Sequence, residues 1–259
     1  MITISYALRS DVGCVRTNNE DTILLNREFC QDESRDGSFF MHNFTRFAAI
    51  VADGMGGHEG GEFASQLAVE SFDEFLNSLP DELLSDNIVV ATKEWAQRAH
   101  NLINTKGIEL PQFRGMGTTF VGLFSYEGRV FTINIGDSRL YRHRNGILKQ
   151  ISEDHSMRNL TGDQTQQSNL IYNSLGAGET VFADVEDVTE RILPGDHYLV
   201  CSDGITDMLT DEQIDAVIEE AMQNNWSDRD LVEHMVDAAK VAGGKDNISA
   251  IWLTISEKA

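Results

Sequence analysis

The sequence predicts an α+β fold in which antiparallel sheets carry helices on their outer faces. Strand-like and helix-like segments come in blocks along the 259 residues and do not alternate strictly. Residues 118–152 form a long β-rich run that is interrupted by the turn signals "YEG", "GD" and "RNG". Two earlier stretches carry apolar residues at helical spacing. Together these patterns favour antiparallel sheets over a parallel βαβ arrangement.

The first part of the chain predicts three strands and a helix. Residues 2–8 alternate in polarity, 22–26 form a second short strand, and 46–52 are typical of a buried strand. The polar residues 27–44 are expected to form a hairpin tip or a surface loop. A helix is expected from Gly61 onward. Its apolar positions at helical spacing are Phe63, Ala64, Leu67, Ala68, Phe72, Phe75 and Leu76.

A second helix is expected at about 86–105, and residues 118–152 are then predicted to form an antiparallel meander. Residues 156–172 are polar and are expected to be irregular. A strand at 197–204 ends in Asp-Gly, and 247–256 closes the chain as a strand. The apolar face of the second helix comprises Ile88, Ala91, Trp95, Ala99 and Leu102.

Two capping-box patterns predict the starts of two further helices. Thr210 with Gln213 precedes "IDAVIEEAM", and Ser227 with Asp230 precedes "LVEHMVDAAKVA". In each pair the first side chain accepts a bond from the helix backbone while the second reaches back to the cap.

Composition limits the kind of protein. The chain carries 42 Asp and Glu against 20 Lys and Arg, a net charge of −22, which disfavours nucleic acid and anionic membranes as partners. It lacks an apolar run long enough for a bilayer, and its N-terminus does not resemble a signal peptide. Three widely spaced cysteines are expected to be free thiols in a reducing compartment. We therefore expect a soluble cytoplasmic protein.

Acidic residues recur where predicted strands start or stop. Any single Asp-Gly is more often a turn or a helix cap, but several strand-end acids can meet across a pair of sheets. Clustered carboxylates repel one another, and a hard divalent cation relieves this repulsion. Few His or Cys residues accompany them, which favours Mg²⁺ or Mn²⁺ over Zn²⁺. The strand-end acids are Asp21, Asp53, Asp137, Asp203, Asp207 and Asp246.

The segment "VADGMGGHEGGE", residues 51–62, adds five glycines and a histidine directly after Asp53. Glycine clusters mark backbone that turns tightly or approaches another group closely. The fixed strand would hold the carboxylate in place, and the glycines would let the backbone approach a metal and enter the next helix.

Eight motifs occur together in an order that resembles the metal-dependent protein phosphatases of type 2C in their bacterial form. The resemblance runs from about Ser10 to Leu253. Each motif alone is weak, but the ordered set is specific. The motifs are "SDVGCVRTNNED", "VADGMGGHEGGEFAS", "GMGTT", "NIGDSRLYR", "EDHS", "SLGAG", "CSDGITDML" and "GGKDNISAIWL".

The resemblance implies one catalytic domain over residues 1–259, built as a four-layer αββα sandwich with two central antiparallel sheets flanked by helices. It implies two core Mn²⁺ or Mg²⁺ ions in a cleft at one end. Asp53 would bridge both metals and the Gly54 carbonyl would bind one of them. Asp203 and Asp246 would complete the second metal.

The resemblance assigns roles to further residues. Glu20 and Asp21 would hold metal-bound waters, and Asp137 with Asp207 would help to form a weaker third metal site. Arg16, five residues before Asp21, would grip the phosphate, although alone it could be a surface arginine in a turn.

His58 keeps two interpretations. A histidine near this position is proposed as the general acid in the family, whereas a histidine in a glycine-rich loop is as often structural or exposed. His155 of "EDHS" is expected to be structural, and Cys201 is expected to be a small core residue.

The implied activity is hydrolysis of phosphoserine and phosphothreonine in proteins by a monomer that opposes a bacterial Ser/Thr kinase. Two alternatives stay open: a phosphatase of small phosphorylated molecules, and an inert phosphoprotein-binding regulator. One departure is clear, because only residues 157–173 fill the segment that forms a longer flap in many bacterial relatives.

Overall fold

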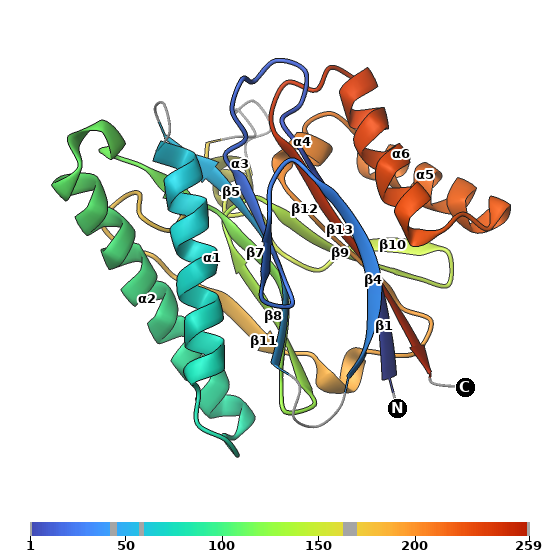
Figure 1. Ribbon diagram of the computed structural model, residues 1–259, viewed down its shortest axis with the longest axis horizontal. Coiled ribbons are helices and arrows are strands. Elements are labelled where there is room, and N and C mark those ends of the chain that lie inside the picture. Colours follow the sequence, from blue (N-terminus) through green and yellow to red (C-terminus); the bar gives the residue numbers. More distant parts are fainter. Residues whose placement is uncertain (1, 42–45, 57–59, 163–169, 258–259) are drawn as a thin grey trace.

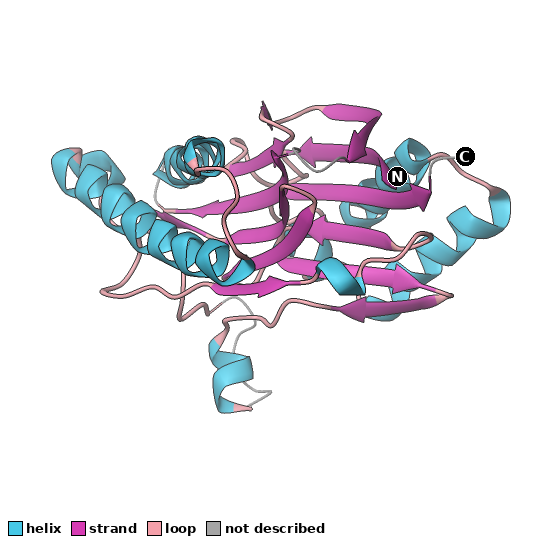
Figure 2. Ribbon diagram, turned by 90° about the horizontal axis from the view of Figure 1, so that it is seen from below, coloured by secondary structure: helices cyan, strands magenta, loops and turns pink. Residues whose placement is uncertain are grey.

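The computed structural model describes residues 2–41, 46–56, 60–162 and 170–257. Two antiparallel sheets lie face to face in the centre, and pairs of helices cover both outer faces (Figure 1). The view from below also places the strands between the two groups of helices (Figure 2). The predicted α+β class and the layered antiparallel arrangement are confirmed.

In the described part of the chain, one sheet has six strands in the order β10-β9-β12-β13-β1-β4. Both chain ends contribute to its middle, because β1 and β13 pair antiparallel along their whole length. Its strands are β1 (Ile2–Asp11), β4 (Ser34–Met41), β9 (Arg139–Arg144), β10 (Ile147–Gln150), β12 (His197–Cys201) and β13 (Ile248–Glu257).

The second sheet has the order β11-β8-β7-β5-β2-β3, and β6 pairs with the end of β5. Its central strand β5 is buried because six of its ten residues form "FAAIVA", the apolar run of the sequence. Its strands are β2 (Asp21–Leu25), β3 (Glu28–Cys30), β5 (Arg46–Met55), β6 (Gly117–Thr118), β7 (Phe120–Tyr126), β8 (Arg129–Ile135) and β11 (Asp184–Asp187).

The long helices cover the two sheets in pairs. Helices α1 and α2 pack on the second sheet, while α5 and α6 pack on the first. Both predicted capping boxes are confirmed at the starts of α5 and α6. The helices are α1 (Gly60–Ser78), α2 (Ser85–Glu109), α3 (Met157–Thr161), α4 (Asp203–Thr206), α5 (Asp211–Asn224) and α6 (Asp228–Val241), with short 3₁₀ turns η1 (Pro111–Phe113) and η2 (Thr189–Arg191).

Three hydrophobic layers hold the sandwich together. Phe72 of α1 contacts Trp95 and Phe120 in edge-to-face arrangements in the layer under α1 and α2. Val51 and Val200 belong to the layer between the sheets, which is fully buried at both positions. The central strands of both sheets are therefore packed on both faces, whereas the edge strands are not.

Leu102 differs from its prediction on the second helix. It is 37% exposed, whereas Ile103 beside it is buried. The buried face of α2 therefore runs through Trp95, Ala99 and Ile103, which lie four residues apart on one side of the helix.

The prediction that residues 27–44 form only a hairpin tip or loop is wrong. They include β3 and β4, and β4 pairs with β1 from Ile2↔Met41 to Arg9↔Ser34. Every residue of β4 is exposed or half-buried, because it is an edge strand. Its hydrogen bonds with β1, not apolar periodicity, make it a strand.

The predicted single meander at 118–152 is also wrong. Strands β7 and β8 pair in one sheet, whereas β9 and β10 pair in the other. The "GD" at Gly136 and Asp137 is thus a crossing between sheets, and Gly136 adopts a φ of +111° there. The segment 156–172, expected to be irregular, contains α3, whose N-cap is Ser156. Residues 163–169 of the expected short flap lie outside the described residues.

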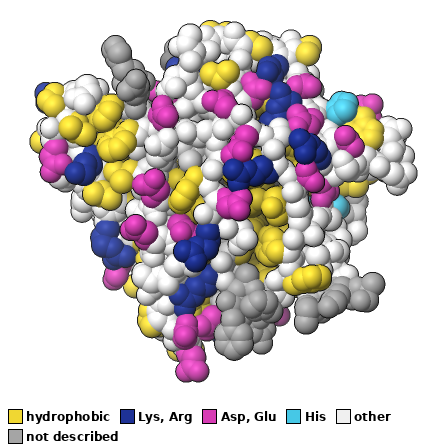
Figure 3. Space-filling model, in the orientation of Figure 1, with side chains coloured by type: hydrophobic (Ala, Val, Ile, Leu, Met, Phe, Trp, Pro, Cys, Tyr) yellow, Lys and Arg dark blue, Asp and Glu magenta, His cyan; other side chains and the backbone are white. Residues whose placement is uncertain are grey.

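Charges of both signs are interspersed on the face in Figure 3. Arg9 of β1, for example, forms ion pairs of 2.6 Å with Glu233 and 2.8 Å with Asp237 on α6. All three cysteines are free, as expected, and Cys201 is fully buried. None of the helices in the described part is long and apolar enough to cross a membrane.

Candidate metal centre

Asp21 and Asp53 are directly opposite each other on neighbouring strands. The pairing of β2 with β5 makes them Cα partners, so their side chains leave the same face of the sheet. Thr119 fixes this part of β5, because its Oγ1 accepts a bond of 3.0 Å from the Asp53 amide. Like charges placed directly opposite destabilise a sheet unless another group compensates them.

Asp21 is almost fully buried and only half satisfied. Its Oδ2 accepts a bond of 2.8 Å from Ser202 Oγ, and its Oδ1 has no partner among the described residues. Burial above all, with the charges of Asp203 and Asp246, raises the pKa of Asp21 to about 7, although two serine hydrogen bonds oppose the rise. A buried carboxylate oxygen without a hydrogen-bond partner can serve as a ligand for a cation.

Two further carboxylates come from the other sheet. Asp203 begins α4 directly after β12, and Asp246 precedes β13. Burial, followed by the charges of Asp207 and Asp246, raises the pKa of Asp203 to about 7. Burial and then the charge of Asp203 raise the pKa of Asp53 well above its usual range.

Asp137 lies at the crossing between the sheets. It is 7% exposed, and its Oδ1 is a second buried carboxylate oxygen without a partner in the part of the chain described. Burial, followed by the charges of Asp203 and Asp154, raises the pKa of Asp137 well above its usual range. Asp207 is exposed at the end of α4 and also raises the pKa of Asp137.

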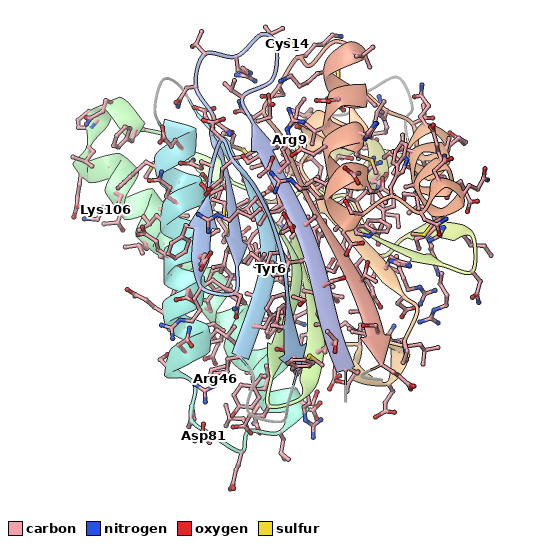
Figure 4. All side chains as sticks on the ribbon, turned by 45° about the vertical axis from the view of Figure 1, so that its right-hand side comes forward. Tyr6, Arg9, Cys14, Arg46, Asp81 and Lys106 are labelled. Carbon is pink, nitrogen blue, oxygen red and sulfur yellow. The ribbon has the colours of Figure 1, made fainter. Side chains whose placement is uncertain are left out.

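Arg16 lies at the rim of this cluster. Its Nη2 forms an ion pair of 2.7 Å with Asp246 Oδ2, and about half of its side chain is exposed. The loop that carries it lies beside the end of α6 in Figure 4, where Cys14 is labelled, and the Cys14 amide donates to the Gly244 carbonyl at 2.8 Å. The guanidinium is thus the cation nearest to Asp246 in the described residues.

Glycine is required at position 54 by close backbone packing. A Cβ there would lie 2.1 Å from the Gly61 carbonyl oxygen and 2.5 Å from the Glu20 carbonyl oxygen. The Gly54 amide donates to that Glu20 oxygen at 3.2 Å, which brings Glu20 to the end of β5. Burial, opposed by the charge of Arg16, raises the pKa of Glu20. Asp53 and Gly54 lie inside β5, whereas the sequence placed them just after it.

The donor set fits a hard divalent cation. Within residues 2–41, 46–56, 60–162 and 170–257, no three His, Cys, Asp or Glu side chains are already arranged as a closed metal-binding group. However, Asp21 Oδ1 and Asp137 Oδ1 are buried without a partner in the described residues, and the charge of Asp203 acts on Asp53. All these donors are oxygens, which suits Mg²⁺ or Mn²⁺. His58 lies outside the described residues.

Sequence reasoning missed the polar residues that hold this cluster. Asn247 Oδ1 accepts from the Glu20 amide at 2.8 Å, and its Nδ2 donates to the carbonyls of Val12 and Asn18. It therefore fixes both ends of the loop that carries Arg16. The signals were adjacent to the acids: Asn247 in "KDN" and Ser202 in "CSDG". His155, expected to be structural, is buried and accepts from the Gly136 amide at 3.1 Å.

Known proteins are similar to this chain in sequence and in fold. A serine/threonine phosphatase stp from Listeria monocytogenes is 28% identical over 253 residues, which cover 94% of this chain and 92% of that protein. The serine/threonine protein phosphatase PstP of Mycobacterium tuberculosis is 31% identical over 96% of this chain and 45% of its own length. The PstP catalytic domain in complex with two manganese ions has a TM-score of 0.75 at 27% identity, covering 99% of this chain and 100% of that one.

The chain combines two stacked antiparallel sheets with a cluster of acidic oxygen donors at the place where the sheets meet. This combination places it in the class of metal-dependent phosphatases. The family described as Protein phosphatase 2C matches residues 24–238, which is well over half of the chain. The chain therefore belongs to the protein phosphatase 2C family.

Proposed function

We propose that this protein is a metal-dependent serine/threonine protein phosphatase that hydrolyses phosphoserine and phosphothreonine monoesters. The observation that carries the proposal is the convergence of acidic side chains from both sheets, of which Asp21 and Asp137 are buried and each leave one oxygen without a partner in the described residues. Burying carboxylates costs free energy, so a cluster of them indicates a site whose function depends on their charge. The names of the relatives and the two manganese ions of PstP support the same reaction.

Asp53, the Gly54 carbonyl, Asp203 and Asp246 would hold the two core ions, which are Mn²⁺ or Mg²⁺. When bound, such ions lower the pKa of an attacking water and neutralise charge on the phosphoryl group. The protein's own contribution is to fix these oxygens in position: Asp53 within a paired strand, and Asp203 at the start of α4.

Other residues complete the proposed roles. Glu20 and Asp21 would hold waters of the centre, and Asp137 with Asp207 would support a third, weaker ion. Arg16 would bind phosphate through its planar guanidinium, whose geometry matches two phosphate oxygens. Its present partner Asp246 is a carboxylate, so the side chain already reaches an anion at this rim.

His58 would protonate the leaving serine or threonine oxygen. Since nitrophenolate leaves without a proton, His58→Ala should slow a phosphoserine peptide more than p-nitrophenyl phosphate.

We further propose that residues 1–259 act as one domain, as a monomer, on proteins phosphorylated by a bacterial Ser/Thr kinase. The three free thiols favour a reducing compartment such as the cytoplasm. The net charge of −22 makes nucleic acid an unfavourable partner.

Hydrolysis of a phosphothreonine peptide with added Mn²⁺ or Mg²⁺ tests the function. We expect turnover that chelator abolishes, and a loss of several orders of magnitude in Asp53→Ala, with the exposed Glu220→Gln as a control. Full activity in excess chelator would refute the metal-dependent reaction. Preference for sugar phosphates over peptides would indicate a small-molecule phosphatase, and inactivity on both would indicate a binding protein.

A further inference from the structure

A cavity of about 400 Å³ lies outside the carboxylate cluster, at the open edge between the two sheets. Strands β8 and β11 form one wall, and Leu140 with residues 151–153 forms the other. Lys93 of α2 completes its lining. This volume is in the range of small-ligand sites, which run from roughly 300 to 1,000 Å³.

The sequence of β8 explains why the sheets do not close here. Alternate residues of a strand face opposite sides, and Val130 faces the hydrophobic layer between the sheets. Thr132 and Asn134 follow on that same side, while Phe131 and Ile133 pack toward the helices. The layer between the sheets therefore changes from apolar to polar along one strand, and a cavity replaces hydrocarbon packing.

Asn134 leaves an unused acceptor in the cavity wall. The residue is 4% exposed, and its Nδ2 donates to the Glu153 carbonyl at 2.7 Å. Its Oδ1 is buried and has no hydrogen-bond partner in the described part of the chain. A buried acceptor without a partner costs free energy, so a ligand that donates a hydrogen bond here would be favoured.

The lining is predominantly negative. Glu153, Asp184 and Glu186 contribute carboxylates, of which Glu186 forms an ion pair with Arg191, and Lys93 is the one basic residue among the described residues that line the cavity. Asp184 is the cross-strand partner of Asn134. Its Oδ2 lies 3.0 Å from His155 Nε2.

The His155 ring does not neutralise Asp184. Its Nδ1 accepts from the Gly136 amide and lies 2.7 Å from Asn173 Nδ2, so the ring proton is on Nε2 and the imidazole is neutral. The negative charge of Asp184 therefore remains at the cavity.

Two half-exposed aromatic rings lie next to these acids. Tyr172 and Phe182 are 40% and 45% exposed, and their ring centroids lie 5.8 and 4.6 Å from that of His155. Burial and then the charges of Glu153 and Asp184 raise the pKa of Tyr172, which is consistent with its closeness to them. Aromatic faces beside carboxylates favour cations.

We propose that this cavity binds a guanidinium or primary ammonium group. Such a group supplies donors for Asn134 Oδ1 and positive charge for the carboxylates, while Tyr172 and Phe182 flank the cavity without lining it. An anionic ligand would meet three carboxylates. His155 lies between the two sites, since its ring contacts Asp184 of the cavity and accepts from the backbone amide of Gly136, directly before Asp137.

Direct binding tests the proposal without any catalysis. The probe is butylguanidinium, compared with neutral butylurea of similar shape, followed through the Asn134 side-chain amide by NMR at about 0.15 M salt, where the Debye length is about 8 Å. We expect the cation to bind more tightly and the double variant Glu153→Gln, Glu186→Gln to weaken it about tenfold. The matched control Glu220→Gln removes one exposed charge elsewhere and should change nothing.

Equal binding of the two probes, or equal effects of the double variant and the control, would overturn the proposal. Unchanged backbone amide shifts away from the cavity, in the same NMR spectra, verify that the variants are folded.

A second experiment, which rests on the proposed function, identifies the source of the cation. Phosphothreonine peptides carrying either arginine or neutral citrulline near the phosphate are compared by kcat/KM. If the wild type prefers the arginine peptide and the double variant does not, the cavity binds an arginine side chain of the substrate. No preference, with butylguanidinium binding intact, assigns it to a free small cation. Failure to hydrolyse any peptide would refute the phosphatase function alone, because the binding result stands without turnover.

Discussion

Asp21→Asn should stabilise the metal-free protein while it weakens metal binding. Asp21 is 1% exposed, and its Oδ1 has no partner in the described residues. Asparagine has nearly the same shape, keeps an oxygen acceptor for Ser202 and carries no charge. The substitution therefore removes the cost of burying a carboxylate beside Asp53 and Asp203.

The pKa of Asp21 gives the size of the effect. It rises from 3.8 to about 7 in the folded protein, mainly through burial. Because the folded state holds this proton more tightly than the unfolded chain, the carboxyl destabilises the fold increasingly as pH rises from 3.8 to about 7. The difference of about three between these two values corresponds to about 4 kcal/mol above pH 7. Below pH 3.8 the cost disappears.

Urea unfolding in chelator at about pH 8 and about pH 5 measures this gain. We expect Asp21→Asn to raise the free energy of unfolding by about 2–4 kcal/mol at the higher pH and by less than half of that at the lower. Added Mn²⁺ should stabilise the wild type more than the variant, since a ligand stabilises only the state that binds it. A variant no more stable than the wild type in chelator at the higher pH would refute this reasoning.

Three further changes test other parts of the structure. Arg16→Ala should raise KM for p-nitrophenyl phosphate more than it lowers kcat, and an unchanged KM would place Arg16 outside the phosphate site. Asp137→Ala should lower turnover but spare the two core ions in a calorimetric Mn²⁺ titration; loss of all binding would contradict this. Arg144→Met should lower the free energy of unfolding by about 3–5 kcal/mol, because it leaves the fully buried Asp196 without its ion pair. Arg129→Met, which breaks an exposed pair of 3.6 Å, should cost under about 1 kcal/mol and serves as its control.

The helices and most strands could be predicted because their signals are local. The capping boxes at Thr210 and Ser227 and the apolar run at the centre of β5 are examples. Strand β4 could not be predicted in this way, since its partner β1 is distant in sequence and its own side chains are polar. The crossing at Gly136 was missed for a related reason: a Gly-Asp pair marks a turn but not which sheet the next strand joins.

The acids of the site could be predicted from their positions at strand ends, but their mutual geometry could not. That Asp21 faces Asp53 depends on the register of β2 against β5. The roles of Ser202 and Asn247 depend on contacts between the two sheets. A polar residue next to a strand-end acid is too common to be assigned such a role from sequence alone.

The carboxylates of the centre come from both sheets, so a cation held between them ties one sheet to the other. The distance between Asp53 and Asp203 then depends on how far the sheets slide past each other. Sliding is limited by the side chains between them, such as Val51 and Val200. A smaller side chain in this layer would change the carboxylate spacing, and with it metal affinity, before the protein unfolds. Apolar side chains of this layer would thus help to set the carboxylate spacing of the proposed centre.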